Sequence, residues 1–268
     1  MTRIIAVANQ KGGVGKTTTA VNLAAALAVA ERHTLLIDID PQGNATSGLG
    51  RDTRELTKSI YHVLIGEGSL SEVILPTEIP HLFLAPSNID LIGAEIEMID
   101  LPQREVRLKQ ALESLEGKFD YILIDCPPAL SLLTVNALTA AGSVLVPLQC
   151  EYFALEGLTQ LMKTIALIKN SFNAGLSLEG ILLTMFSPRT NLSRQVVDEV
   201  REHFHDQVFQ TVIPRNVRLS EAPSFGRPVL LYDIRSKGAE AYFSFAKEVL
   251  SHEQEGIGAG AEGPHPRH

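Results

Sequence analysis

One stretch constrains this chain more than any other part of its sequence: Gln10-Lys11-Gly12-Gly13-Val14-Gly15-Lys16-Thr17-Thr18. An apolar run, Ile4–Ala8, comes before it, and an Ala/Leu-rich run, Ala20–Ala30, follows it. This order predicts a strand, a glycine loop and a helix, with backbone N–H groups and the positive helix end facing phosphate oxygens. Lys16 would reach the outer phosphates, and the Thr17 hydroxyl would bind Mg²⁺. The predicted nucleotide contacts in this loop are Lys11, Gly12, Gly13, Val14, Gly15, Lys16, Thr17 and Thr18.

The loop departs from the usual pattern G-x-x-x-x-G-K-[ST], because Gln10 stands where the first glycine belongs and Lys11 adds a second ammonium group. Lys16 already serves the phosphates, so Lys11 has two interpretations. It is either a solvated loop lysine or a residue that reaches a phosphate bound by a facing subunit. The variant K-G-G-V-G-K-T-T resembles the deviant Walker A ATPases, in which the first lysine crosses a dimer interface to the partner's nucleotide.

The composition is ordinary for a globular protein: 268 residues, 45% of them hydrophobic and 20% charged. A net charge of −8 and a pI near 5.5 argue against a wholly basic nucleic-acid binder, although a local basic stripe is compatible with them. No uncharged apolar run approaches the length of a membrane span. Met1-Thr2-Arg3 leads directly into the first predicted strand, without a signal peptide. We therefore expect a cytoplasmic protein that does not bind membranes.

The two cysteines, Cys126 and Cys150, are interpreted as small buried hydrophobic residues in a reducing cytosol. Neither belongs to a C-x-x-C pair, which disfavours a zinc site. The alternative is an Fe–S cluster that two subunits share through four thiolates. The position of Cys126 inside a nucleotide motif, described below, argues against that alternative.

Strand-like and helical runs alternate throughout the chain. The predicted strands are Ile4–Ala8, Thr34–Ile39, Leu82–Ala85, Tyr121–Asp125, Ser143–Pro147, Gly180–Met185 and Val208–Ile213. The predicted helices are Thr17–Ala30, Gln103–Leu115, Leu132–Ala141, Leu155–Ser171, Asn191–His205 and Gly238–His252. This alternation predicts an α/β fold of the P-loop NTPase type, with a mainly parallel, twisted β-sheet and helices on both faces. Residues 1–252 are expected to form one ATPase domain, and the Gly- and Pro-rich residues 253–268 a disordered tail.

Two carboxylates close the second predicted strand, in the sequence Asp38-Ile39-Asp40-Pro41-Gln42-Gly43-Asn44. Side chains two residues apart on a strand point the same way, so both acids are expected at the carboxyl edge of the sheet, where α/β proteins bind ligands. A purely structural role is disfavoured, because burying two unpaired carboxylates is costly. We predict that Asp40 orients the attacking water and that Asp38 supports Mg²⁺ from its outer shell.

The strand Tyr121–Asp125 has four apolar residues closed by an acid, as a Walker B strand does, and Asp125 is predicted to hold Mg²⁺ through water. Phosphoryl transfer requires positioning and charge neutralisation more than covalent chemistry. The predicted catalytic residues are Lys11, Lys16 and Asp40, and the predicted metal residues are Thr17, Asp125 and Asp38. No acceptor-binding motif is visible, so water is the expected acceptor.

Taken together, these motifs resemble the ParA/Soj family of chromosome or plasmid partitioning ATPases, within the MinD/ParA superfamily. Matching blocks extend over roughly residues 1–250, so the resemblance covers nearly the whole expected fold. Besides the glycine loop, they are Asp38–Gly50, Ile124–Pro128, Gln149–Gly157 and Ile213–Gly226.

The resemblance implies an ATP-sandwich homodimer in which Lys11 acts across the interface, Asp40 is the hydrolytic aspartate and Asp125 the magnesium aspartate. It also implies an adenine pocket near Thr184 and the turn from Pro214 to Asn216. From this, the remaining predicted ATP contacts are Pro41, Met185, Pro214 and Asn216. Family members bind double-stranded DNA without sequence preference, and a ParB/Spo0J-type partner stimulates hydrolysis through a short basic N-terminal segment. A nucleoid-associated protein is therefore expected.

Arginines in the second half of the chain are candidates for phosphate contacts with DNA. Arg189 and Arg218 are predicted to bind DNA, because both stand in contexts that match the family. The other interpretation is solvated surface charge. Since no base-reading motif is present, binding is expected to be electrostatic and strongly dependent on salt.

Two other enzyme classes share parts of this pattern. One is the membrane-bound division ATPase MinD, which needs a basic amphipathic C-terminal helix, whereas the last helical region here, Lys247–Glu255, is net acidic. The other is a P-loop ligase that acts on a metabolite, similar to dethiobiotin synthetase. That enzyme would need a second substrate pocket.

Overall fold

The computed structural model describes residues 2–152 and 154–259, with the side chains of the last helix described as far as His252. Within these residues, eight strands form one sheet in the order β3-β4-β2-β5-β1-β6-β7-β8. Neighbouring strands are parallel, except for the pair β3 and β4. The strands are β1 (Arg3–Val7), β2 (Thr34–Asp38), β3 (Leu75–Pro76), β4 (Leu82–Ala85), β5 (Tyr121–Asp125), β6 (Ser143–Gln149), β7 (Ser177–Phe186) and β8 (Val208–Pro214).

The three central strands β2, β5 and β1 end together at one edge of the sheet. In the strand register, Asp125 pairs with Val7 on one side and with Asp38 on the other. The loops that follow these strands therefore start side by side, at the carboxyl edge. In parallel sheets this edge is where ligands bind.

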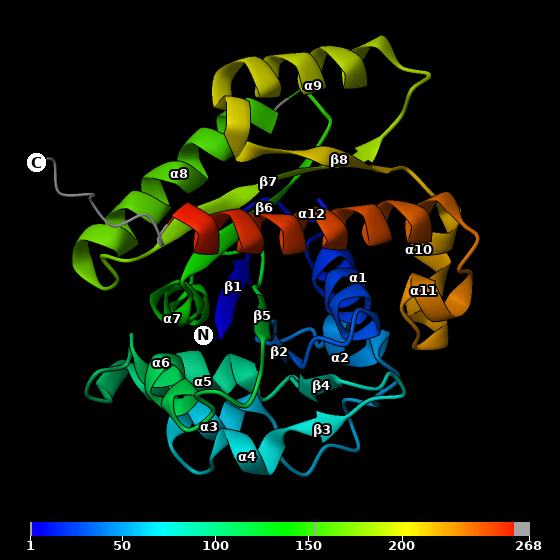
Figure 1. Cartoon of the computed structure of the whole chain (residues 1–268). Helices are drawn as coiled ribbons and strands as arrows, with labels where there is room; N and C mark the ends of the chain where they lie inside the picture. The colour runs from blue at the N-terminus through cyan, green and yellow to red at the C-terminus, as the bar shows by residue number, and fades with distance from the viewer. Residues whose placement is uncertain (1, 153, 260–268) are drawn as a thin grey trace, which may run out of the picture.

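Helices cover both faces of the sheet (Figure 1). On one face, α1 (Lys16–Val29) and α12 (Lys237–Ala259) share a core with the inward side chains of the strands. The same face includes the short helices α2 (Asn44–Gly48), α10 (Val217–Glu221), η3 (Ala222–Phe225) and α11 (Val229–Tyr232). The other face is covered by α3 (Ile60–Ile65), α4 (Leu70–Val73), α5 (Leu91–Glu97), η1 (Met98–Asp100), α6 (Arg107–Glu113), α7 (Leu132–Ala140), α8 (Ala154–Ser171), α9 (Asn191–Phe204) and η2 (His205–Gln207). These observations confirm the predicted α/β fold.

The helix α1 is enclosed nearly all round, between the sheet and α12. Its residues from Thr19 to Ala28 are buried, and most of them are alanine, leucine or valine. A helix that is buried on every side is apolar on every side, rather than amphipathic. The many alanines let the backbone of α1 approach both layers closely, which holds the glycine loop at its N-terminus in a fixed position.

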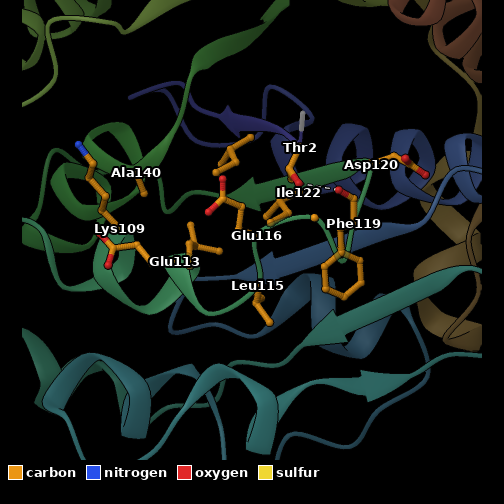
Figure 2. Close-up of a pocket in the computed structure, with 12 residues that line it drawn as sticks. Thr2, Lys109, Glu113, Leu115, Glu116, Phe119, Asp120, Ile122 and Ala140 are labelled. Carbon is orange, nitrogen blue, oxygen red and sulfur yellow. Dashed lines mark hydrogen bonds between the residues drawn. The ribbon is translucent and has the colours of Figure 1, made fainter.

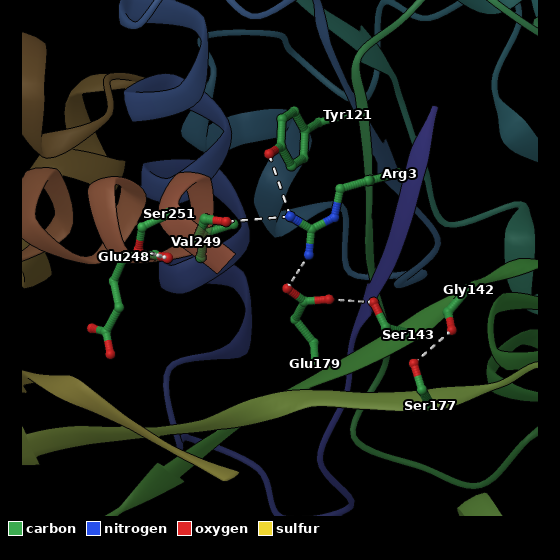
Figure 3. A network of polar contacts seen from close by, with 9 residues as sticks. All are labelled: Arg3, Tyr121, Gly142, Ser143, Ser177, Glu179, Glu248, Val249 and Ser251. Atoms are coloured by element: carbon green, nitrogen blue, oxygen red, sulfur yellow. Dashed lines mark hydrogen bonds and ion pairs between the residues drawn. The ribbon is translucent and has the colours of Figure 1, made fainter. Parts of the chain in front are cut away.

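Arg3 ties the far end of α12 to the amino edge of the sheet (Figure 3). Its guanidinium donates a hydrogen bond to the carbonyl of Val249 (3.2 Å) and forms an ion pair with Glu179 Oε1 (2.5 Å). The second oxygen of Glu179 accepts a hydrogen bond from the Ser143 hydroxyl (2.6 Å). The Arg3 guanidinium thus connects the first strand to the last helix and, through the Glu179 carboxylate, to β7 and β6.

The predicted strands are all present. The differences concern the short strand β3, which the sequence did not predict, the ends of several strands and several short helices. Thus β7 starts earlier than predicted, and α6 starts at Arg107 instead of at Gln103. Gln103 follows Pro102 and has a φ of 56°, a left-handed conformation that an α-helix excludes. The helix α12 runs past the predicted end at His252 as far as Ala259, and residues 260–268 of the predicted tail lie outside the described residues. Phe153, in one of the family-like blocks, is also outside them.

Within the described part of the chain, none of the helices combines the length and the apolar character needed to cross a membrane.

Candidate functional site

The glycine loop joins the end of β1 to the start of α1, as predicted. Gly13 and Gly15 have φ angles of 74° and 90°, which side chains with a Cβ adopt only with strain. Around Gly12 and Gly13 there is open space, because a Cβ there would meet no atom within 4 Å. Asn9 holds the start of the loop: its side chain donates to the Pro147 carbonyl (2.8 Å) and accepts from the Lys11 N–H (3.0 Å). The loop is an open cradle of N–H groups on a rigid support.

Lys16 lies inside this cradle. Its side-chain nitrogen donates a hydrogen bond to the carbonyl of Lys11 (3.2 Å), and the residue is only 6% exposed. Burial lowers the pKa of the Lys16 ammonium, and the nearby Asp125 carboxylate opposes this effect. An ammonium group in such a place is oriented for an anion inside the loop.

Lys11 has a partner within its own chain. Its ammonium lies 3.3 Å from Glu151 Oε2, and the two side chains are 42% and 46% exposed. The other oxygen of Glu151 accepts a hydrogen bond from the Gln149 side chain. Gln149 is the last residue of β6 and Glu151 follows that strand, so both lie at its carboxyl end. In the single chain, therefore, Lys11 points to a neighbouring loop rather than freely into solvent.

The Asp38 side chain is fully buried and accepts hydrogen bonds from the loop that follows β2. One oxygen accepts from the Asp40 N–H (3.1 Å), and the other accepts from the N–H and the hydroxyl of Thr46 (both 2.8 Å). Burial raises the pKa of Asp38 to about 6, against the lowering effect of these hydrogen bonds. The predicted outer-shell contact with Mg²⁺ stays a prediction. The visible role of Asp38 is to shape the loop that carries Asp40.

The Asp40 carboxylate accepts from the N–H of Gln42 (3.0 Å), and the Asp40 carbonyl accepts from the Ser87 hydroxyl (2.7 Å). The N–H of Ser87 in turn donates to the Thr46 hydroxyl (2.9 Å). A closed set of hydrogen bonds thus joins the loops after β2 and β4. Asp40 itself is 6% exposed.

Asp125 lies beneath the glycine loop with no hydrogen-bond partner for either carboxylate oxygen among the described residues. It is fully buried, and burial together with the charge of Asp38 raises its pKa well above the usual range. The Thr17 hydroxyl is close enough to lower this pKa without completing a hydrogen bond. Two buried acceptors without donors fit a hydrated cation, because Mg²⁺ keeps several of its waters in nucleotide sites. The predicted metal residues Thr17 and Asp125 are therefore suited to magnesium.

A pocket of about 300 Å³ adjoins the loop and brings together most of the predicted base-contacting residues. Met185, Pro214 and Asn216 line it beside Gly15 and Thr18 of the loop, together with Thr184, Ile213, Arg215, Leu219, Ser220, Pro223 and Tyr242. The Thr184 hydroxyl donates to the Val14 carbonyl (2.8 Å) and so links the pocket wall to the loop. Val14 and Pro41 belong to the neighbouring turns and are not lining residues.

Tyr242 is a member of this pocket that local sequence patterns do not reveal. It comes from α12, is 1% exposed, and its hydroxyl lies 3.1 Å from the Thr19 hydroxyl on α1. Glu151, Thr46 and Ser87 were also not predicted. Glu151 and Thr46 stand in family-like blocks, which is the one signal that pointed to their surroundings. Ser87 and Tyr242 have no such signal.

A larger cavity, of about 620 Å³, lies at the opposite, amino edge of the sheet. Figure 2 shows Thr2, Ile122, Phe119 and Glu116 around it. Among the described residues, its lining includes no residue of the glycine loop and neither Lys16 nor Asp125. The smaller pocket, by contrast, includes Gly15 and Thr18 of the glycine loop.

The two arginines predicted to contact DNA follow neighbouring strands. Arg189 is exposed in the loop after β7, and Arg218 is exposed on α10 after β8. Arg218 forms ion pairs with Glu221 (2.8 Å) and Asp233 (3.2 Å) of its own chain. Its guanidinium charge is thus shared with two carboxylates.

Both cysteines are buried. Burial raises the pKa of the Cys126 thiol far above its usual range, and the Asp125 charge adds to the effect. Burial raises the pKa of Cys150 to about 11. Thiols in this state are protonated at neutral pH and are poor metal ligands.

Comparison with known proteins identifies the family of this chain. Residues 2–178 match a family model described as an AAA domain. The chain is 58% identical over 248 residues to the chromosome partitioning protein ParA of Myxococcus xanthus, covering 92% of this chain and 88% of the relative. It is 55% identical to the sporulation initiation inhibitor protein Soj of Bacillus subtilis, covering 94% and 99%.

Among solved structures, a protein described as cobyrinic acid a,c-diamide synthase from Mycobacterium smegmatis, with bound ADP and magnesium, has a TM-score of 0.85. It is 42% identical, covering 96% of this chain and 97% of that one. The nucleotide and metal in that relative agree with the prediction of ATP and Mg²⁺ as cofactors. The relatives match this chain over nearly its whole length, and the glycine loop and the acids at the ends of β2 and β5 agree with the match. The chain therefore belongs to the ParA/Soj family of partitioning ATPases.

Proposed function

We propose that this protein is an ATP-dependent DNA-partitioning ATPase, in which two chains close over two nucleotides, hold DNA without sequence preference, and release it on hydrolysis. The observation that carries the proposal is Asp125, whose two buried oxygens have no hydrogen-bond donor among the described residues and lie beside Lys16 and Thr17 of the glycine loop. Asp40 and Lys16 approach the same place from neighbouring elements. This arrangement suits hydrolysis of a magnesium-bound triphosphate.

Each residue near the loop has a separate task. The N–H groups of the loop and Lys16 bind and orient the phosphates, while Thr17 and Asp125 hold the cation with its waters. Bound Mg²⁺ supplies charge neutralisation for the leaving phosphate. Asp40 orients the water, and Asp38 keeps the Asp40 loop in position through the backbone contacts described above. Catalysis is thus mainly positioning and electrostatics.

Lys11 has the role that needs a second chain. Because it lies on the exposed rim of the loop, it can leave Glu151 and reach a nucleotide in a facing subunit. The family resemblance supports this homodimer, a ParB/Spo0J-type partner that stimulates hydrolysis, and a cytoplasmic protein associated with the nucleoid. Arg189 and Arg218 are the proposed DNA contacts.

The test combines a slow-hydrolysis variant with size measurement. Asp40→Ala should form a dimer in ATP and Mg²⁺, stay monomeric in ADP, and retain duplex DNA only as the dimer. Lys16→Ala, the matched control, should bind neither nucleotide nor DNA. A monomer in ATP at every protein concentration, as seen by size-exclusion chromatography with light scattering, would contradict the proposal.

One alternative deserves its own measurement because a relative carries the name. The Mycobacterium smegmatis protein is described as cobyrinic acid a,c-diamide synthase. The relatives described as ParA and Soj are more similar in sequence, which favours the partitioning function. Incubation with ATP, glutamine and cobyrinic acid should give no amide product, whereas ATP turnover should rise with the DNA and the partner protein.

A further inference from the structure

The helix α5 and the following turn η1 are apolar on two sides. On the inner side, Leu91, Ala94 and Met98 are fully buried against the core. On the outer side, four isoleucines repeat at intervals of three and four residues: one precedes α5, two lie on α5 and one lies in η1. The spacing of four places the two on α5 on one face of the helix. These four, called the isoleucine stripe below, are Ile89, Ile92, Ile96 and Ile99, with exposures of 61%, 49%, 69% and 54%. Exposed apolar side chains that gather on one surface, rather than standing singly, favour a docking surface.

The surroundings of the stripe are acidic. No lysine or arginine occurs in the sequence between Lys58 and Arg104. The carboxylates in that interval are Glu67, Glu72, Glu78, Asp90, Glu95, Glu97 and Asp100. Arg104, at the far end of the stripe, donates to the Ile99 carbonyl (2.6 Å) and pairs with Glu105 (3.0 Å). Glu72 and Glu78 pair with Lys58 and Arg227. The carboxylates within the segment of the stripe itself are Asp90, Glu95, Glu97 and Asp100, so a ligand that covers the isoleucines would meet these four acids.

The negative charge near the isoleucine stripe favours some binding partners over others. A second copy of the chain, stripe against stripe, would bring like charges together. DNA and anionic lipid would be repelled for the same reason. We propose that the isoleucine stripe docks an amphipathic segment of a protein partner that carries apolar side chains at helical spacing and lysine or arginine beside them. The inference rests on the proposed function, for which it assigns the surface that a hydrolysis-stimulating partner uses.

The stripe is directly connected to the hydrolytic residue. Ile89 stands two residues after Ser87, whose hydroxyl holds the Asp40 carbonyl (2.7 Å). Between them, Asn88 accepts a hydrogen bond from Ser59 (3.1 Å) and donates to Asp90 (2.7 Å). A segment that binds the first turn of α5 would shift or fix this loop and, with it, the position of Asp40. Docking at the stripe therefore acts on hydrolysis without contact with the nucleotide.

The experiment uses the full-length protein with ATP and Mg²⁺, and two labelled peptides as probes. The first has leucines at i, i+3, i+4 and i+7 with lysines on both sides, and the second has glutamate in place of every lysine. Binding is measured by fluorescence anisotropy. The test variant is Ile92→Ser/Ile96→Ser. The matched control is Leu167→Ser, since Leu167 is equally exposed (64%) but lies on α8.

We expect the lysine peptide to bind the wild type and the Leu167→Ser protein with equal affinity. Its affinity for the double variant should be about tenfold lower. Added salt should weaken its binding to the wild type. The glutamate peptide should not bind. The lysine peptide should also raise the ATP turnover of the wild type but not that of the double variant. Equal binding to wild type and double variant, or no binding to the wild type, would overturn the assignment. DNA retention in ATP is measured in parallel, because its loss in the wild type would overturn the proposed function instead.

Discussion

At the residue scale, the crowding of acids at the carboxyl edge sets the pH behaviour of the nucleotide-free protein. Asp38 and Asp125 face each other across β2 and β5, and burial raises the pKa of both. A carboxyl group with a raised pKa binds its proton more tightly in the folded chain than in the unfolded one. Stability from these groups is therefore fullest at low pH and is lost as pH rises, for Asp38 between 3.8 and about 6.

Asp125→Asn should accordingly stabilise the protein when magnesium and nucleotide are absent. The neutral amide removes a buried charge without donors, and the expected gain at pH 8 is roughly 1–3 kcal/mol. Near pH 4, where the carboxyl group of the wild type is protonated, the two proteins should unfold alike. Urea unfolding at both pH values measures the difference. Equal stability at pH 8 would mean that Asp125 is already neutralised there. The same variant should lose magnesium-dependent ATP turnover.

At the element scale, the anchoring of α12 depends on Arg3 and its buried partner. Arg3→Gln leaves the Glu179 carboxylate, which is only 6% exposed, without its ion pair. We expect a loss of roughly 1–3 kcal/mol in the free energy of unfolding. Arg54→Gln is the control, because Arg54 also pairs with an aspartate, Asp52, but is 87% exposed. No measurable change is expected there. If both variants unfold like the wild type, the anchor is unimportant.

The same helix reaches the nucleotide pocket through Tyr242. Tyr242→Phe keeps the ring but removes the hydroxyl that faces Thr19. The expected cost is about 1 kcal/mol of stability, with ATP affinity lowered a few-fold because α12 forms part of the pocket wall. Isothermal titration with ATP and urea unfolding check both effects. Ser244→Ala, an exposed position on α12, should change neither.

The sequence predicted the elements whose signals are local. The glycine loop, the acids at the ends of β2 and β5, and the alternation of strands and helices all lie within short windows. It did not predict contacts between distant segments, such as Tyr242 with Thr19 or Ser87 with Asp40. The sequence around each of these residues contains no pattern that identifies the residue it contacts. Short helices such as α10 and α11 were also missed, since four or five residues show no periodicity.

At the scale of the whole molecule, an acidic protein with a net charge of −8 is proposed to hold DNA. Contacts must then be concentrated at the carboxyl edge around Arg189. Arg189→Ala should weaken DNA retention in ATP and reduce the dependence of affinity on salt by about one phosphate contact. ATP turnover without DNA should be unchanged. Lys118→Ala, at the amino edge, is the control. Retention that is unaffected by Arg189→Ala in filter-binding measurements would exclude this arginine from the interface.

The contact between Lys11 and Glu151 makes any pairing of two chains an exchange reaction. Each Lys11 that turns to a neighbouring molecule would lose its ion pair with Glu151 of its own chain and gain a contact with a phosphate of the nucleotide in the other chain. Because the Lys11–Glu151 pair is about half exposed, breaking it costs little free energy. If two chains pair as proposed, the nucleotide bound in the glycine loop, rather than the lysine contact itself, would determine whether they associate.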